Sequence, residues 1–257
     1  MTRRPSPPLL LLASASPRGR SLLGGAGIRP LICSVEVDEA RLEDEPPEAY
    51  VSRLAHLKAE AGLGKTTATV QAPASAQAPA VVPTMATVSP VSPVSLVSPV
   101  SPVSGLVALG ADTSVVLDGR ILGKPGDEVE ARQMLGALSG RWHEVLTGWC
   151  LLGVGAPSGR LEIRAQGVSC TRVRFKALSL EELRYYLSSG EWRDKAGAYG
   201  IQGAAASFVS ELRGSYTNVV GLPLAEVVDA LASLGIHPAP RDEFAFPPDS
   251  GEGSAGQ

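Results

Sequence analysis

Asp112 and Lys124 flank a predicted hairpin and have the residue types and spacing for metal and phosphate chemistry. The apolar run 106–109 predicts a buried strand that ends at Gly110, just before Asp112. A second short apolar run then meets Asp118-Gly119, a dipeptide typical of a two-residue hairpin turn. A carboxylate at the end of a buried strand and a lysine one hairpin later could face the same ligand. A surface hairpin with solvated charges is the alternative interpretation.

A second candidate site lies where the predicted first strand, 9–13, leads into a helix. Ser16 can cap a helix whose first position is Pro17. Free backbone N–H groups and the helix dipole attract anions to such a terminus, and Ser14, Ser16 and Arg18 could complete the site. An ordinary Ser-Pro helix start is one alternative. A signal peptide is another, but a first strand explains the same apolar residues.

Other charged candidates lie on a predicted helix and in two loops. Lys58 belongs to a helix that begins at Pro46-Pro47 and runs to about residue 61, where it is either a snorkelling surface lysine or a phosphate contact. Glu39 ends an acidic segment that either faces a metal or is solvated. The stretch 190–203 is rich in glycine and charge, a composition often found in functional loops. Its polar side chains include Asp194, Lys195 and Gln202.

The elements that position these residues alternate between strands and helices. Two capping boxes, Asp127 with Glu130 and Ser179 with Glu182, predict helices that are ended by glycines at 140 and 190. A last helix is predicted over 224–234. The predicted strands are an antiparallel pair, 142–152 and 161–175, followed by 204–209 and 215–220.

Composition limits the classes of protein that the chain can belong to. Its 257 residues can form one large domain or two lobes with an ample core. A net charge of -3 argues against a general nucleic-acid binder, and no apolar run reaches membrane-spanning length. Three cysteines without CxxC spacing indicate free thiols in a reducing compartment, so we expect a cytoplasmic protein.

The segment 66–104 differs in composition from the rest of the chain. It consists mainly of Ala, Pro, Val, Ser and Thr and ends in Ser-Pro-Val repeats, which predicts an extended or disordered insertion. It is either a docking arm for a partner or a tolerated loop expansion. The tail 238–257 is predicted to be flexible. The stretch 62–67, where the insertion begins, looks like the end of a Walker A loop, but Ala59 replaces the first glycine and a helix precedes it, so we reject a P-loop.

Taken together, these stretches resemble the Maf family of nucleoside triphosphate pyrophosphatases. The resemblance rests on the order and spacing of several short motifs along the chain. These are Ser14-Ala-Ser-Pro-Arg18, Arg53 to Lys58, Gly110-Ala-Asp-Thr113, Gly123-Lys-Pro125, Leu138-Ser-Gly140 with His143 and Thr147, Asp194-Lys-Ala-Gly197 through Gln202-Gly203, Gly214 to Asn218, and Gly221-Leu-Pro223. It covers the chain except for the insertion and both ends.

The resemblance implies an α/β fold like that of inosine triphosphate pyrophosphatases, in which a twisted mixed sheet with flanking helices spans two lobes. A single catalytic domain would consist of 1–65 and 105–237, with the site in the cleft between the lobes. The implied reaction is hydrolysis of a nucleoside triphosphate to monophosphate and diphosphate with a divalent metal, Mg²⁺ or Mn²⁺. A homodimer is also implied.

The resemblance also assigns substrate preference to particular residues. Arg18, Thr113 and Gln202 match the positions that mark the branch hydrolysing dTTP and UTP. The branch that hydrolyses 7-methyl-GTP usually has tryptophan in place of Arg18, and it remains an alternative, as does a non-catalytic nucleotide-binding regulator of cell division. Gly19 and Ser21 depart from the family pattern, which usually has arginine and often glutamate there.

Each candidate residue has a chemical role in this reaction. Cations must neutralise a triphosphate before water can attack it. The candidates for phosphate binding are Ser14, Ser16, Arg18, Lys58, Lys124 and Lys195. We expect Asp112 to accept a proton from the water that attacks the α-phosphorus, and Glu39, Asp112 and Asp194 to be metal ligands. Thr113 and Gln202 can donate to or accept from a pyrimidine base.

Overall fold

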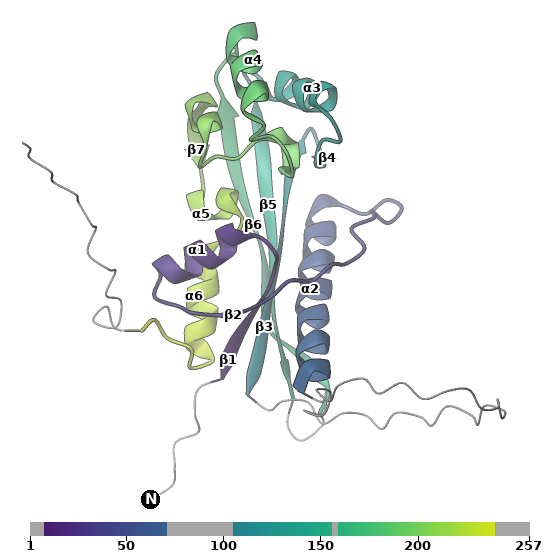
Figure 1. Cartoon of the computed structure of the whole chain (residues 1–257), viewed down its shortest axis with the longest axis vertical. Coiled ribbons are helices and arrows are strands. Elements are labelled where there is room, and N and C mark those ends of the chain that lie inside the picture. Colours follow the sequence, from purple (N-terminus) through teal and green to yellow (C-terminus); the bar gives the residue numbers. More distant parts are fainter. Residues whose placement is uncertain (1–7, 71–104, 156–158, 240–257) are drawn as a thin grey trace, which may run out of the picture.

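The computed structural model describes residues 8–70, 105–155 and 159–239 (Figure 1). Its centre is a seven-stranded sheet in the order β2-β1-β3-β5-β6-β7, with β4 paired to β3. The strands are β1 (Leu9–Ala13), β2 (Leu31–Cys33), β3 (Leu106–Leu117), β4 (Arg120–Leu122), β5 (Trp142–Val154), β6 (Leu161–Phe175) and β7 (Val209–Arg213). Strand β1 is parallel to β2 and β3, and the other pairs are antiparallel. This mixed α/β sheet confirms the predicted fold class.

Helices cover both faces of the sheet and cap one end of it (Figure 1). Helix α2 (Pro47–Val70) lies on one face, and α1 (Pro17–Gly25) and α6 (Leu224–Ser233) lie on the other. Helices α3 (Glu128–Leu138) and α4 (Leu180–Ser189) pack at the far end of the long strands and form the second lobe. The described ranges contain no helix that is long and apolar enough to cross a membrane.

The two faces have separate cores because successive side chains of a strand point in opposite directions. Leu106 and Ala108 of β3 pack with Ala55 of α2. The alternate residues Val107 and Leu109 pack on the other face with residues of α1 and α6. Each face of β3 is therefore held by its own helices.

Strand β3 continues through Gly110, so the prediction that it ends there was wrong. A Cβ atom at Gly110 would lie 2.0 Å from the carbonyl oxygen of Ala55, and one at Gly148 of β5 would lie 2.3 Å from that of Val51. The missing side chains let the backbone of α2 lie directly against the sheet. Gly110 therefore serves the packing of a helix and does not mark a turn.

One edge of β3 is open in the middle of the strand. Strand β1 pairs with β3 only as far as Leu12 opposite Leu109, and β4 pairs with it only from Val115 onward. Neither strand pairs with the interval 110–114, which contains Asp112 and Thr113. The open edge lies beside the carboxyl end of β1, where α/β proteins commonly bind ligands.

Several local predictions are confirmed. Asp118 and Gly119 have φ values of 51° and 75°, as a hairpin turn with two left-handed residues requires. The capping box of Ser179 and Glu182 begins α4, and Gly190 ends it in a left-handed conformation. Strands β5 and β6 form the predicted antiparallel pair.

Other element predictions were wrong in type or length. The segment 204–208 is a 3-10 helix, η2 (Ala204–Phe208), and β7 begins only at Val209. The predicted strand 215–220 is a short helix, α5 (Tyr216–Val220), because the Ser215 side chain caps it by accepting from the Asn218 amide. Helix α2 continues to residue 70, beyond its predicted end, so the Walker-like residues 62–66 are helical and the rejection of a P-loop is confirmed. The predictions for 71–104 and 240–257 lie outside the described residues.

Candidate active site

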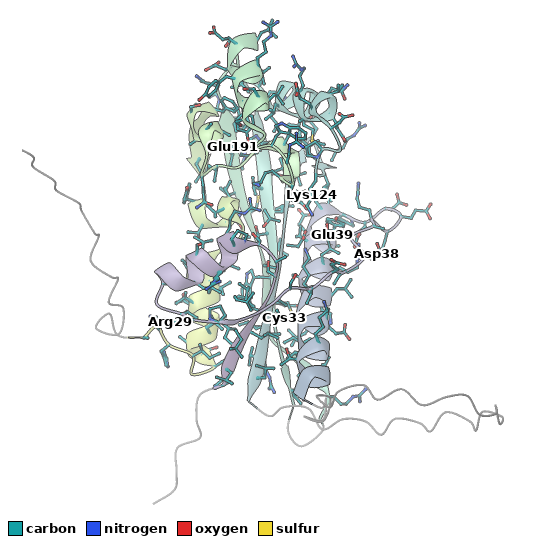
Figure 2. All side chains as sticks on the ribbon, in the orientation of Figure 1. Arg29, Cys33, Asp38, Glu39, Lys124 and Glu191 are labelled. Carbon is teal, nitrogen blue, oxygen red and sulfur yellow. The ribbon has the colours of Figure 1, made fainter. Side chains whose placement is uncertain are left out.

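Two lysines and two carboxylates form a cluster on the α2 side of the open edge. The Lys58 ammonium donates to Asp112 Oδ1 at 2.6 Å and lies 3.0 Å from Glu39 Oε1. Lys124 donates to Glu39 Oε2 at 3.0 Å. Figure 2 shows Glu39 and Lys124 beside one another near the N-terminal end of α2. The loop after β2, helix α2, strand β3 and the loop after β4 each supply one residue.

Neighbouring opposite charges keep Lys58 and Glu39 ionised although burial opposes it. Burial of Lys58 lowers its pKa, but Asp112 and Glu39 raise it more, so the net pKa lies above its ordinary value. Burial raises the pKa of Glu39, but Lys58 and Lys124 outweigh this effect and the net pKa is lowered. The side chains of Lys58 and Asp112 are only 16% and 12% exposed, so their attraction is weakly screened by solvent.

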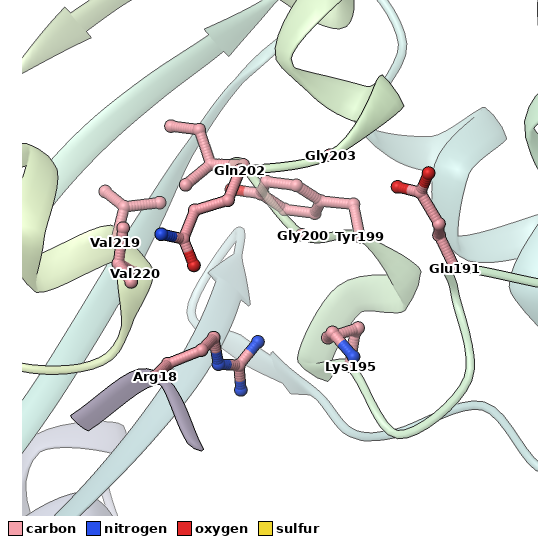
Figure 3. A pocket seen from close by; sticks show the side chains of 10 residues that line it. Arg18, Glu191, Lys195, Tyr199, Gly200, Gln202, Gly203, Val219 and Val220 are labelled. Atoms are coloured by element: carbon pink, nitrogen blue, oxygen red, sulfur yellow. The ribbon is translucent and has the colours of Figure 1, made fainter. Parts of the chain in front are cut away.

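A pocket on the other side of the open edge gathers a second set of polar residues. It encloses about 170 Å³. Figure 3 shows Arg18 and Lys195 extending into it from opposite sides, with the Gln202 amide facing the Arg18 guanidinium. The residues that line it are Arg18, Glu191, Lys195, Tyr199, Gly200, Ile201, Gln202, Gly203, Val219 and Val220.

Arg18 brings a positive charge to the pocket. Arg18 is the second residue of α1, shortly after the end of β1, and it is half-buried. Burial lowers the pKa of its guanidinium, yet the group stays charged because arginine is not deprotonated in proteins. Its guanidinium makes no ion pair or hydrogen bond with the parts of the chain that the structure describes. A desolvated charge without a partner favours a ligand of opposite charge.

The cluster and the pocket are joined by a direct contact between their loops. The Gly197 amide donates to the Gly123 carbonyl at 2.9 Å, which ties the loop of Lys195 to the loop of Lys124. Gly197 has φ 63°, and a Cβ atom there would lie 2.9 Å from the Val115 side chain. The glycine therefore allows the second lobe to close against β3.

Thr113 faces the pocket side of the sheet. Its Oγ1 lies 2.8 Å from Oγ1 of Thr147, directly opposite it on β5. Thr147 is fully buried and donates to the Asn218 carbonyl at 3.1 Å. Gly221 follows the pocket residue Val220, and a Cβ atom at Gly221 would lie 3.8 Å from Thr113 Oγ1.

Ser14 and Ser16 connect the end of β1 to α1. Ser16 occupies the N-cap position, as predicted, but its side chain makes no capping hydrogen bond. Ser14 Oγ instead accepts from the Ser16 amide at 3.1 Å. The hydroxyl of Ser16 and the first amides of α1 therefore lie next to Arg18 with capacity to bind an anion.

Comparisons with known proteins identify the family of this chain. A family model described as "Maf-like protein" matches residues 9–234. The chain belongs to this family. It is 41% identical over 236 residues to a protein named dTTP/UTP pyrophosphatase from Anaeromyxobacter dehalogenans, covering 92% of this chain and 98% of that one.

Two further relatives carry the same name. The dTTP/UTP pyrophosphatase of Hahella chejuensis is 41% identical, over 88% of this Maf-like chain and 92% of its own. That of Sphingopyxis alaskensis is also 41% identical, over 89% and 98% of the two chains. The match thus extends over nearly the whole length of each relative.

The carboxylates of this Maf-like chain suit a metal that is shared with a substrate. Glu39 and Asp112 converge on one point, the Lys58 ammonium. Mg²⁺ is commonly held by one or two carboxylates together with substrate phosphates, so this pair fits such an ion. Across the described ranges no three His, Cys, Asp or Glu side chains could hold a metal by themselves, so Asp194 does not complete a metal site with this pair.

Sequence reasoning assigned no role to three residues that shape the pocket. Tyr199 lines the pocket, and its hydroxyl oxygen lies 2.8 Å from His143 Nε2. Glu191 also lines the pocket, and its carboxylate accepts from the Ala204 amide at 2.9 Å. Burial lowers the pKa of His143 to about 4, so the ring is neutral. His143 and Tyr199 belong to the motifs that carried the resemblance, but their contact joins residues 56 positions apart.

Proposed function

We propose that this Maf-like chain hydrolyses dTTP and UTP to the nucleoside monophosphate and diphosphate, and so removes nucleotides from the cellular pool. The observation that carries the proposal is the Lys58–Asp112 ion pair at the open edge of β3, beside the pocket of Arg18 and Lys195. A carboxylate that can accept a proton thus lies next to separate cations that can hold a polyphosphate. The names of the relatives support the same substrates.

In this proposal the basic residues hold the phosphates. Arg18 can make a bidentate contact, and the lysines act as point charges. The charge of a triphosphate is spread over many oxygens, and Arg18, Lys58, Lys124 and Lys195 approach the site from four different elements. The hydroxyl of Ser16 and the amides of α1 add neutral donors.

Asp112 is proposed as the proton acceptor. The water oxygen forms a bond to the α-phosphorus, the bond from that phosphorus to the bridging oxygen breaks, and diphosphate leaves with the bonding electrons. The proton of the water passes to the Asp112 carboxylate. Glu39 and Asp112 are the residues that would hold Mg²⁺ or Mn²⁺, which supplies Lewis acidity when bound.

Substrate preference is proposed to come from Arg18, Thr113 and Gln202. Gln202 and Arg18 face each other across the pocket (Figure 3). Thr113 lies near Gly221, which follows the pocket residue Val220. The amide and hydroxyl groups can make hydrogen bonds with the edge of a pyrimidine. We also propose a cytoplasmic location, which the free thiols of Cys33, Cys150 and Cys170 support. A homodimer is proposed from the family resemblance alone.

A panel of substrates tests this proposal. The full chain is incubated with UTP, dTTP or 7-methyl-GTP and either Mg²⁺ or Mn²⁺, and monophosphate and diphosphate are separated by anion-exchange chromatography. We expect UMP and dTMP with equal amounts of diphosphate. Faster turnover of 7-methyl-GTP would support the other branch of the family. Binding without turnover of any nucleotide would support a regulator.

A further inference from the structure

We propose that Thr147 fixes the hydrogen-bond direction of Thr113 and thereby makes Thr113 an acceptor for the N3–H group of uracil or thymine. Thr147 does not reach the pocket itself and acts only through its neighbour. This inference rests on the proposed function and adds the means by which the site would distinguish uracil and thymine from cytosine.

The direction follows from the chemistry of three oxygens in a row. A carbonyl oxygen can only accept, so the Thr147 hydroxyl donates its one hydrogen to the Asn218 carbonyl at 3.1 Å. Thr147 Oγ1 then has no hydrogen for Thr113. The 2.8 Å contact between the two hydroxyls therefore has Thr113 as the donor. Thr113 Oγ1 keeps its two lone pairs and can only accept from a ligand.

The arrangement is held rigidly by its surroundings. Thr147 is 0% exposed, and so is Asn218. Asn218 Nδ2 donates to the Val145 carbonyl and to Thr171 Oγ1, both at 3.0 Å. These bonds fix α5 against β5 and β6, so the Asn218 carbonyl cannot turn away from Thr147. Thr113, by contrast, is partly exposed at the open edge of β3.

An acceptor at this position has a single partner on uracil or thymine. Both bases present one N–H donor, at N3, between two carbonyl acceptors. Cytosine presents an unprotonated N3, which would face the lone pair of Thr113 and repel it. Gln202 carries both an acceptor and donors and can satisfy either base by turning its amide. Discrimination therefore depends on Thr113 and on the residue that sets its direction.

The test compares two substitutions at Thr147 by the ratio of kcat/KM for UTP to that for CTP. Thr147→Val keeps the volume but frees the Thr113 hydrogen for the N3 of cytosine. We expect the ratio to fall by about tenfold or more, the scale of one hydrogen bond. Thr147→Ser keeps the hydroxyl, and its ratio should stay within about threefold of wild type. A purely structural role would lower both kcat/KM values together and leave the ratio unchanged.

The possible outcomes separate this inference from the proposed function. If the wild-type chain hydrolyses UTP but Thr147→Val keeps its ratio, the inference is wrong and the proposed function stands. If the wild type hydrolyses neither UTP nor dTTP, the proposed function is wrong and the inference falls with it. If Thr147→Val does not fold, Thr113→Val at the partly exposed position serves instead. An unchanged ratio in that variant also overturns the inference.

Discussion

Asp112 and Thr113 are consecutive in β3, yet their side chains lie on opposite faces of the sheet. Asp112 bonds to Lys58 of α2, whereas Thr113 contacts Thr147 on the side of α5. Both residues belong to the interval of β3 that neither β1 nor β4 pairs with. A nucleotide at this edge could therefore meet the proton acceptor on one face and the base-reading residues on the other.

Asp112→Asn is expected to lower kcat for UTP by about 10²- to 10⁴-fold, because the amide cannot accept the proton of the attacking water. The Lys58 ammonium keeps its contact with Glu39 at 3.0 Å, so the fold should be retained. Diphosphate release measures the rate, and circular dichroism checks the fold. Turnover near the wild-type value in a folded variant would show that Asp112 is not the base.

Lys124→Ala is expected to lower kcat/KM. The loss of transition-state stabilisation should be roughly 2–3 kcal/mol, the scale of losing one charge-stabilising donor. Its side chain is 55% exposed and contacts only Glu39 among the described carboxylates, so the stability should change little. Lys176→Ala is the matched control, because that lysine is 45% exposed and paired with Glu182 in the other lobe. Equal activities of the two variants would place Lys124 outside the site.

Gly110→Ala and Gly136→Ala are expected to change stability in opposite directions. A methyl group at Gly110 would lie 2.0 Å from the Ala55 carbonyl and push α2 off the sheet, which should cost about 3 kcal/mol or more. Gly136 lies exposed within α3 with nothing within 4 Å of the added atom, so alanine should stabilise by about 0.5–1 kcal/mol. Urea unfolding measures both, and a tolerated Gly110→Ala would contradict the close packing described above.

Local signals in the sequence were sufficient for much of the fold. The strand 9–13, the capped helix that ends at Gly190 and the antiparallel pair predicted over 142–152 and 161–175 follow from apolar runs, capping residues and turn residues. The prediction of a strand over 215–220 was wrong because the apolar residues there suit either a strand or one helical turn. The Ser215 cap decides for the helix. The prediction that β3 ends at Gly110 was wrong for another reason. The sequence does not distinguish a glycine that lets a helix pack closely on a strand from a glycine that ends the strand.

The site was predictable as a set of residues but not as an arrangement. Lys58 and Asp112 are 54 residues apart, and only the packing of α2 on β3 brings them to 2.6 Å. The open edge of β3 depends on where two other strands stop pairing, which no local pattern reports. The direction of the Thr113–Thr147 bond likewise depends on a carbonyl of a helix that was predicted to be a strand.

His143 is expected to make the protein lose stability in mild acid. Burial lowers its pKa in the fold to about 4, from an ordinary value of 6.5, and its ring is held between Phe175 and Tyr199. The unfolded chain therefore binds the proton more readily than the folded chain does. The stabilising effect is present above pH 6.5 and is lost as the pH falls from 6.5 toward 4.

The change from pH 7.5 to pH 5 should cost the wild type about 2 kcal/mol more than His143→Gln, which cannot be protonated but can still bond to Tyr199. Urea unfolding at both pH values gives the two free energies for each protein. Carboxylates such as Glu182, whose pKa is lowered to about 2 by Lys176, contribute equally to both proteins and cancel in the comparison. An equal loss in wild type and variant would mean that His143 is not held neutral in the fold.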